Sequence, residues 1–392
     1  MGISNAIVVG GGIGGLAAAA ALARRGIVVT LIEKTPALKD VGAGLQISPN
    51  GLAVLKALGV QTQLKLKGAV EAQGVVLRDY KAGDQVAHLD LKRLRGDQQY
   101  YFMHRADLID VLAGAAKRQN VTFELGAQVA SVRPGSPPQV QLVDGSTRRA
   151  ELIVAVDGIH SVARPVLNGP DAAEFSGQVA WRAVIPNTVK HPAEAHVHMG
   201  PGRHLVSYPL RGGDSINLVA VEEREVWAAE SWNQPDDPAH LRTAFAAFGG
   251  AAGEMIGAVR EVTLWGLHLH PVASRWQEAG LALLGDAAHP TLPFLAQGAN
   301  LALEDAWVLG ALVGGGAEDA LALYQSRREA RVRRVIAAAQ RNAWRYHLHP
   351  GPLRTAAHFG LRMASRIAPG RMISAFDWLY GHDVTTADAH QP

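Results

Sequence analysis

The sequence contains no cysteine among its 392 residues. This absence excludes disulfide bonds, thiolate nucleophiles, cysteine-ligated zinc and iron–sulfur clusters. It fits a reducing compartment. Any redox chemistry of the chain must therefore be supplied by an organic cofactor.

The sequence also lacks an excess of charge of one sign, since 38 lysines and arginines face 35 acidic residues. A net charge of +3 is too balanced to indicate a nucleic-acid partner. The stretch of residues 6–23 carries no charge over 18 positions, the length of a membrane span, but five of these residues are glycine. No basic segment precedes it, as a secretory signal would require, because the first Lys or Arg is Arg24. These features predict a cytoplasmic protein that binds neither a membrane nor nucleic acid.

The beginning of the chain has the pattern of a strand–helix–strand unit. A short apolar run at residues 6–9 stops at a glycine-rich turn, an alanine-rich helix follows at residues 16–25, and β-branched residues return at 27–33. Such units place two parallel strands in a sheet that helices cover. The sequence therefore predicts an α/β fold that starts with a Rossmann-like unit.

The turn of this unit carries the spacing Gly10-x-Gly12-x-x-Gly15. Gly10 permits a tight turn, Gly12 lets a pyrophosphate approach the backbone, and Gly15 allows close packing of helix and strand. Glu33 ends the second strand, where its carboxylate can accept hydrogen bonds from a ribose. The pattern predicts an adenine dinucleotide and leaves NAD and FAD open.

Further along, the sequence alternates between helix-like and strand-like segments. Helices are expected at 49–58 and 104–118, antiparallel strands at 74–91, further short strands at 121–124, 128–133 and 140–143, buried strands at 151–155 and 281–284, and an antiparallel sheet within 177–266. Beyond Glu318 the chain is helical and basic. We interpret the seven arginines between Tyr324 and Arg345 as the solvated face of a packed helix.

Two later motifs resemble those of the flavoprotein aromatic hydroxylases, the class A flavoprotein monooxygenases. They are an Asp-Gly motif within residues 155–164 and a Gly-Asp motif at 285–290, and with the glycine fingerprint they follow the order of the family. The resemblance implies FAD as the bound cofactor. It also implies that Asp286 holds ribityl or ribose hydroxyls, that Arg105 contacts the diphosphate, and that Asp157 and Arg164 help organise FAD and a passing nicotinamide nucleotide.

The resemblance divides the chain into an FAD-binding domain interrupted by a substrate domain. The FAD-binding parts are predicted at 1–73, 100–176 and 267–316, with substrate-domain strands at 74–99, the substrate domain itself at 177–266, and a C-terminal helical region at 317–392. No second glycine fingerprint follows a strand, so NADH or NADPH is expected to bind only transiently.

A stretch after the Gly-Asp motif opens a helix at Gly298, Ala299 and Asn300. The free N–H groups and positive dipole of a helix start suit the negative charge that a reduced flavin carries. Many relatives have glycine at the position of Ala296. Four residues are predicted to contact substrate, although Arg182 could equally have a structural role: Gln46, Arg182, Pro293 and Phe294.

The segment around His204 and Tyr208 resembles that of 3-hydroxybenzoate 6-hydroxylase and 6-hydroxynicotinate 3-monooxygenase, in which a His and a Tyr four residues apart face the substrate. Positions four apart on a strand point to the same side, so both can reach one ring. The pKa of histidine makes His204 the candidate that draws the phenol proton. No metal is predicted, because the pairs His196/His198 and His268/His270 lack a third ligand.

The resemblance thus implies a monooxygenase in which NAD(P)H reduces FAD and O2 forms a flavin C4a-hydroperoxide that hydroxylates a small phenolic aromatic acid. The leading substrate is 3-hydroxybenzoate, attacked para to its hydroxyl. Salicylate and 6-hydroxynicotinate are alternatives with the same chemistry, and a non-enzymatic FAD-binding sensor is a more distant one. A homodimer is compatible with the sequence, which does not determine the oligomeric state.

Overall fold

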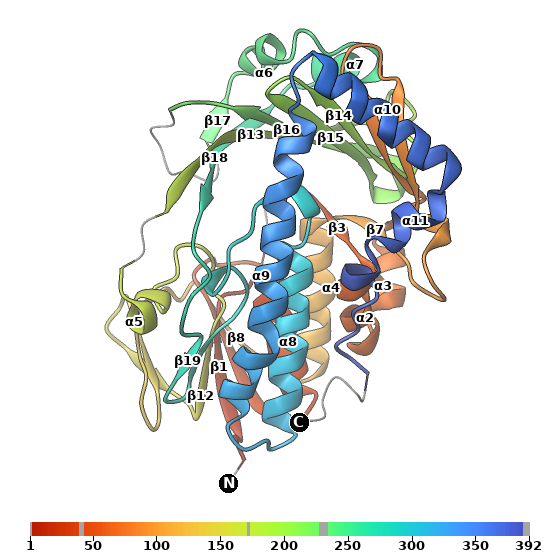
Figure 1. The fold of residues 1–392 in the computed structure, drawn as a ribbon. Helices are drawn as coiled ribbons and strands as arrows, with labels where there is room; N and C mark the ends of the chain where they lie inside the picture. The colour runs from red at the N-terminus through yellow and green to blue at the C-terminus, as the bar shows by residue number, and fades with distance from the viewer. Residues whose placement is uncertain (1, 39–42, 171–172, 227–233, 387–392) are drawn as a thin grey trace.

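The computed structural model describes residues 2–38, 43–170, 173–226 and 234–386, without the side chains of residues 342–344. Two sheets dominate it. A mainly parallel sheet contains both strands of the N-terminal strand–helix–strand unit, and a larger, mainly antiparallel sheet lies at the opposite end of the molecule (Figure 1). The long helix α9 (Ala320–Tyr346) runs from the first sheet towards the second (Figure 1).

The first sheet is six-stranded, in the order β19-β20-β12-β1-β2-β8. Its central strands are parallel, with β1 between β12 and β2, as the strand–helix–strand pattern predicts. Apolar β-branched side chains fill them because both faces of the sheet are buried. The strands are β1 (Asn5–Val9), β2 (Val28–Glu33), β8 (Thr122–Leu125), β12 (Leu152–Ala155), β19 (Gln277–Glu278) and β20 (Leu281–Leu283).

Helix α1 (Ile13–Ala23) explains the alanine-rich run after the fingerprint. It packs against both α4 (Arg105–Arg118) and α8 (Gly298–Gly314). Small side chains let the helix axes come close: a Cβ placed on Gly310 of α8 would lie 2.9 Å from the Cβ of Ala21. The run is thus the buried centre of a helix layer.

The second sheet is eight-stranded, in the order β17-β18-β13-β16-β15-β14-β5-β6. All neighbours are antiparallel except β14 and β5, which are parallel. Strands from 74–90 and from 174–269 thus share one sheet, while the domain boundaries stay a prediction. The strands are β5 (Gly74–Asp79), β6 (Gln85–Asp90), β13 (Glu174–Pro186), β14 (Glu194–Gly200), β15 (Arg203–Leu210), β16 (Ser215–Glu223), β17 (Gln234–Asp236) and β18 (Val262–Leu269).

One face of this sheet is covered by α6 (Pro238–Ala244) and α7 (Gly250–Gly257). Leu205 of β15 and Leu218 of β16 point into the apolar core beneath these helices. Alternate residues of a strand point to opposite faces, so the neighbours of these leucines face the interior between the two sheets. This alternation determines which side chains of β15 and β16 face the space between the two sheets.

Two small antiparallel sheets and several short helices complete the fold. The sheets are β3 (Gly44–Ile47), β7 (Tyr101–His104) and β4 (Val70–Glu71), and β9 (Val129–Arg133), β10 (Gln139–Leu142) and β11 (Thr147–Arg149). The helices are α2 (Pro49–Ala57), α3 (Gln61–Leu66), α5 (Arg164–Asn168), α10 (Pro352–Ile367), α11 (Pro369–Ser374), α12 (Asp377–Tyr380) and the 3-10 turns η1 (Leu91–Arg93), η2 (Arg211–Gly213), η3 (Gly285–Ala287) and η4 (Pro293–Leu295).

A buried ion network joins α8 to α9. Glu304 and Asp305 of α8 are fully buried, and the guanidinium of Arg328 lies 2.6 Å from a Glu304 oxygen and 2.7 Å from an Asp305 oxygen. Arg331 adds a second cation at 2.7 Å from Glu304. The expectation that all seven arginines of this region form a solvated face is therefore wrong for Arg328 and Arg331, because two carboxylates in the apolar α8 require buried cations.

The same carboxylates hold two further segments, the Gly-Asp motif and the first turn of α2. Asp305 accepts hydrogen bonds from His289 at 2.6 Å and from the backbone N–H of Gly285 at 3.2 Å. Glu304 accepts one from the side-chain amide of Asn50 at 2.6 Å. Burial raises the pKa of Glu304, but the charge of Arg328 and the contacts of Arg331 outweigh it and lower that pKa to about 2. Both segments are thus anchored to buried carboxylates whose pKa values are lowered by neighbouring cations.

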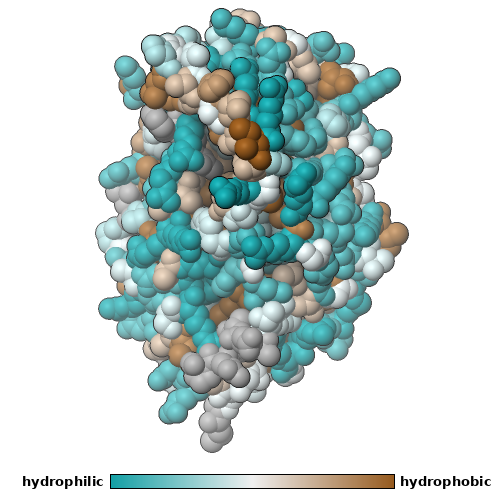
Figure 2. All heavy atoms as spheres, turned by 45° about the vertical axis from the view of Figure 1, so that its right-hand side comes forward, coloured by the Kyte–Doolittle hydropathy of each residue, from teal (hydrophilic) through white to brown (hydrophobic). Residues whose placement is uncertain are grey.

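No helix in the described parts of the chain combines the length and the apolar character needed to cross a membrane. On the face shown in Figure 2 the surface is mostly hydrophilic, with hydrophobic residues in small patches.

Replacing Arg328 by Met should lower the free energy of unfolding by about 3 to 5 kcal/mol, because Glu304 and Asp305 lose the cation that both share. Urea denaturation measures this. The matched control is Arg333→Met on the same helix, whose half-exposed ion pair with Glu329 is worth about 0.5 kcal/mol. Equal losses in both variants would contradict a special role of the buried network.

Replacing Ala296 by Gly should raise the free energy of unfolding by about 0.5 to 1 kcal/mol. Ala296 has φ 52° and ψ 37°, the left-handed region in which a Cβ is strained. The relief exceeds the extra entropy that glycine gives the unfolded chain. Ala299→Gly, in the first turn of α8, is the control and should destabilise. A lower denaturation midpoint for the Ala296 variant would show that the turn carries no strain.

Candidate active site

A cavity of about 710 Å³ lies between the two sheets. One wall comes from the glycine-rich loop, the Gly-Asp motif and the start of α8, and the other from β14, β15, β16 and β18 of the eight-stranded sheet. Its volume is in the range of small-molecule and cofactor sites. The site is therefore one space with a nucleotide side and a sheet side.

The three glycines of the fingerprint have the geometry that their spacing predicts. Gly10 has φ 108°, and a Cβ there would overlap with the backbone of Val156. A Cβ on Gly15 would overlap with the carbonyl oxygen of Gly10, whereas a Cβ on Gly12 would meet no atom within 4 Å. Of the three, only Gly12 lines the cavity. Gly10 and Gly15 shape the turn, and Gly12 leaves room beside it.

Glu33 lies behind this loop and does not line the cavity. Its Oε2 accepts a hydrogen bond from the N–H of Gly11 at 2.6 Å, and its Oε1 accepts one from the N–H of Thr35 at 2.9 Å. The carboxylate thus stands next to the glycine turn, at the edge where a ribose would follow a pyrophosphate.

Asp286 lines the cavity at the carboxyl end of β20, near Arg105. Its side chain is exposed and lines this cavity, and desolvation by the surrounding protein raises the pKa of its carboxyl. The charges of His289 and Arg105 oppose the increase. A carboxylate in this position is suited to accept hydrogen bonds from sugar hydroxyls.

Asp157 and Arg164 do not line the cavity, in contrast to their neighbours Gly158 and Ile159. Asp157 accepts a hydrogen bond from the N–H of Val162 at 2.8 Å. The buried Arg164 donates to the backbone carbonyls of Ala287 and Ala288 at 3.2 and 3.0 Å. Through Arg164, the Asp-Gly motif therefore fixes the backbone of the Gly-Asp motif on the side away from the cavity.

At the start of α8, Gly298 and Ala299 line the cavity and Asn300 does not. Asn300 instead connects two segments: its Oδ1 accepts from the N–H of Ser48 at 3.1 Å, and its amide donates to the carbonyl of Gln46 at 3.0 Å. The helix start and the segment of β3 are thus held in register, with the N–H end of α8 open to the cavity.

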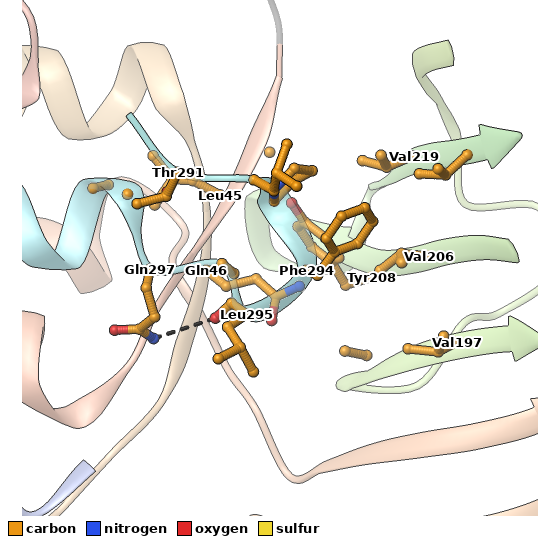
Figure 3. Close-up of a pocket in the computed structure, with 18 of the residues that line it drawn as sticks. Leu45, Gln46, Val197, Val206, Tyr208, Val219, Thr291, Phe294, Leu295 and Gln297 are labelled. Carbon is orange, nitrogen blue, oxygen red and sulfur yellow. Dashed lines mark hydrogen bonds between the residues drawn. The ribbon is translucent and has the colours of Figure 1, made fainter. Parts of the chain in front are cut away.

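On the sheet side, apolar side chains converge on η4. Val197, Val206 and Val219 extend from three adjacent strands towards Phe294 (Figure 3). Pro293, Phe294 and Gln46 all line the cavity, and Gln46 accepts a hydrogen bond from Tyr100 Oη at 2.7 Å. The wall is mainly apolar with a few polar groups, as in sites for aromatic ligands.

His204 and Tyr208 both line the cavity from one face of β15. His204 is buried, and its Nδ1 lies 2.6 Å from Nε2 of His347. Burial lowers the pKa of His204 well below its ordinary value, and the charge of His347 lowers it further. Burial raises the pKa of Tyr208, so its phenol stays protonated. The wall offers a neutral imidazole and a neutral phenol.

Arg182 lines the same wall, with its guanidinium 4.5 Å from the ring centre of Trp265. Its charge lowers the pKa of Tyr208 in opposition to burial, so the two side chains are near one another. A cation thus stands beside the phenol on the wall of the cavity.

Sequence reasoning missed the ion network and the partner of His204. Two adjacent acidic residues within an apolar helix, Glu304 and Asp305, were a usable signal, because such charges need buried partners. His347 gives no such signal, since it meets His204 only through the fold, 143 positions away. Within the described residues, no group of three or more His, Asp or Glu side chains could hold a metal ion.

The nucleotide side fits FAD. The open space at Gly12, the carboxylate of Asp286 and the start of α8 all line the cavity, and they suit a pyrophosphate, sugar hydroxyls and an electron-rich ring, respectively. The apolar sheet side can then hold an aromatic ligand against the ring and exclude water from it.

Comparison with known proteins agrees with this geometry. The family model described as "FAD binding domain" matches residues 4–339. A 3-amino-4-hydroxybenzoate 2-monooxygenase of Streptomyces cremeus is 35% identical, over 97% of this chain and 96% of that protein. A 3-hydroxybenzoate 6-hydroxylase of Polaromonas naphthalenivorans is 31% identical, over 96% of both chains.

Solved structures show the same fold. HpxO of Klebsiella pneumoniae complexed with FAD and uric acid superposes with a TM-score of 0.82 at 26% identity, covering 95% of this chain and 97% of that one. A salicylate hydroxylase substrate complex gives a TM-score of 0.81 at 23% identity, with 98% and 96% covered. The Rossmann-like fold with added antiparallel sheets, the FAD cofactor with NAD(P)H as co-substrate and the oxidoreductase activity predicted above are confirmed. The chain belongs to the FAD-dependent aromatic hydroxylases, the class A flavin monooxygenases.

Proposed function

We propose that this enzyme hydroxylates a small aromatic acid that carries a ring hydroxyl, with 3-hydroxybenzoate, attacked para to its hydroxyl, as the leading substrate. When bound, FAD supplies the chemistry that reduces and activates O2 with electrons from NAD(P)H. The residues of the chain bind and orient the ring, exclude water and move the phenol proton.

The observation that carries the proposal is the position of His204 and Tyr208 on one wall of the cavity whose other wall fits FAD. A phenolate is far richer in ring electrons than a phenol, so removal of the hydroxyl proton favours attack by an electrophilic oxygen. Nδ1 of His204 is turned to His347, which leaves Nε2 as the acceptor for the substrate hydroxyl. Tyr208, protonated, donates a hydrogen bond that orients the ring oxygen.

Arg182 is proposed to hold the carboxylate of the substrate. It is the cation that stands near Tyr208 on the same wall, and stacking on Trp265 fixes the plane of its guanidinium. A planar guanidinium binds a carboxylate through two parallel hydrogen bonds. The ring would thus lie between Arg182 at one end and His204 at the other.

On the nucleotide side, Gly12 is proposed to admit the pyrophosphate, Glu33 the adenosine ribose, Arg105 the diphosphate, and Asp286 the ribityl or ribose hydroxyls. Gly298 and Ala299 would present their N–H groups to the flavin ring. Gly10, Gly15, Asp157 and Asn300 would act indirectly by shaping these segments. The cytoplasmic location and a homodimer stay predictions.

A second substrate, 3-amino-4-hydroxybenzoate, is favoured by the 35% identity to the Streptomyces cremeus enzyme that is named for it. It carries the same carboxylate and ring hydroxyl, and its amino group adds electron density to the ring. The two candidates differ in the ring position attacked, so product analysis separates them.

A panel of aromatic acids should identify the substrate. NADH oxidation and product formation are measured with 3-hydroxybenzoate, 3-amino-4-hydroxybenzoate, salicylate, 6-hydroxynicotinate and the uncharged control 3-hydroxybenzyl alcohol. We expect one acid to give product and the alcohol to fail, with Arg182→Met raising KM for that acid by about 10- to 100-fold, the value of a charge-assisted hydrogen bond. No product from any phenolic acid, despite bound and reducible FAD, would refute the proposed function.

Replacing His204 by Gln should lower the rate of hydroxylation by about 100-fold or more, because loss of a general base costs this much. FAD content and its reduction by NAD(P)H should stay unchanged, since His204 is on the opposite wall. The control is His240→Gln on α6, an exposed histidine on the far side of the sheet paired with Asp236. Hydroxylation at the wild-type rate in the His204 variant would remove this residue from the mechanism.

A further inference from the structure

A chain of three titratable side chains leads from the cavity to the surface. Nδ1 of His204 lies 2.6 Å from Nε2 of His347, and Nδ1 of His347 lies 2.6 Å from Oε1 of Glu223. Both histidines are buried, while the side chain of Glu223 is 47% exposed. His347 follows the end of α9, and Glu223 is the last residue of β16, so the three side chains lead from the cavity wall to the end of that strand.

We propose that His347 and Glu223 form a proton relay that connects His204 with solvent. This inference rests on the proposed function, in which His204 accepts the proton of the substrate hydroxyl. It assigns a role to two residues that touch neither the substrate nor FAD: they carry the proton onward and position the imidazole of His204.

The geometry fixes the tautomers that the relay needs. His204 must present a free Nε2 to the cavity, so its proton is on Nδ1 and is donated to Nε2 of His347. His347 then carries its own proton on Nδ1 and donates it to Glu223. Both contacts are short, and the one to the carboxylate of Glu223 is a charge-assisted hydrogen bond. The exposed carboxylate of Glu223 therefore sets the orientation of the buried His204 ring through the His347 ring that lies between them.

The transfer conserves protons and charge without any redox change. The O–H bond of the substrate breaks and its proton bonds to Nε2 of His204. The Nδ1 proton of His204 passes to Nε2 of His347, and the Nδ1 proton of His347 passes to Glu223 and from there to water. Reverse transfer protonates the product and restores both tautomers.

Burial explains why a relay is needed here. An imidazolium at His204 would be a charge among the rings of Phe294, Tyr346 and His347, whose centres lie 4.9 to 5.8 Å away. Such a charge is costly in an apolar surrounding. If the Nδ1 proton leaves as the Nε2 proton arrives, no net charge stays on the buried ring.

The charged groups around His347 favour transfer of its proton outward to Glu223. Burial lowers the pKa of His347, and its hydrogen bond and charge interaction with Glu223 raise it again. The cations near it, Arg203 and His349, lower it, and Arg203 is itself 3.2 Å from Glu222. Glu223 is thus the carboxylate bonded to His347, and it is open to water.

The first measurement uses the free protein and needs no turnover. Nitrogen-15 and proton NMR of labelled histidine should show both imidazoles as Nδ1–H tautomers, with two protons shifted downfield by the short hydrogen bonds. His347→Gln should remove the downfield proton of His204, whereas His349→Gln, which alters an exposed neighbour, should keep it. Histidines with Nε2–H tautomers in the wild-type protein would overturn the relay.

The second measurement uses the FAD-loaded enzyme and the substrate found with the aromatic-acid panel. His347→Gln should lower kcat by about 10-fold, less than the ~100-fold cost of losing the base itself, while KM changes by less than about twofold. His347→Ala should lower kcat equally and recover with added imidazole. A purely structural role would not respond to imidazole, so failure of rescue together with an unchanged kcat in the Gln variant would refute the relay.

Glu223→Gln separates proton acceptance from hydrogen bonding, because Gln keeps an acceptor oxygen but cannot take up a proton. Its hydroxylation rate should fall at low buffer concentration and recover as the buffer concentration is raised, since the position is exposed. The wild-type rate should not depend on buffer. A buffer-independent rate in the variant would contradict the relay, whereas failure of the wild-type enzyme to form product would instead contradict the proposed function.

Discussion

The site depends above all on two buried carboxylates in one apolar helix. Glu304 and Asp305 share the cation of Arg328, and through their remaining oxygens they hold Asn50, His289 and the backbone of Gly285. These contacts join the segment after β3, the Gly-Asp motif and α8, and the last two of these form part of the nucleotide side of the cavity. Unpaired charges in such a place would be costly, so the network tolerates only one arrangement of the three segments.

The sheet side follows a simpler rule. Along β15 and β16, alternate residues fill the core beneath α6 and α7, and the residues between them face the cavity. His204 and Tyr208 are in the second set, which is mainly apolar. An apolar wall excludes water from a flavin bound beside it, but it also makes a charged imidazole costly. A base that acts in this wall needs an outlet for its proton, and the contact with His347 provides one.

The local sequence pattern was sufficient to predict the features that depend on neighbouring residues alone. The fingerprint glycines, the strand alternation around His204 and the buried strands each leave a periodic or spacing signal, and the structure agrees with it. Long-range pairs leave none: Arg328 is one of seven similar arginines, and His347 meets His204 only because α9 ends near β15. For Asp157 the motif could be recognised in the sequence, but its position outside the cavity lining could not be predicted from it.

We propose that one cavity holds FAD on one wall and a phenolic acid on the other, with the ring hydroxyl at His204. A crystal structure of the FAD-loaded enzyme with 3-hydroxybenzoate, or with whichever acid proves to be the substrate, tests it most directly. We expect the ring hydroxyl within about 2.6 to 3.2 Å of Nε2 of His204, with the carboxylate at Arg182. A ring bound with its hydroxyl turned away from His204, or a flavin outside this cavity, would contradict it.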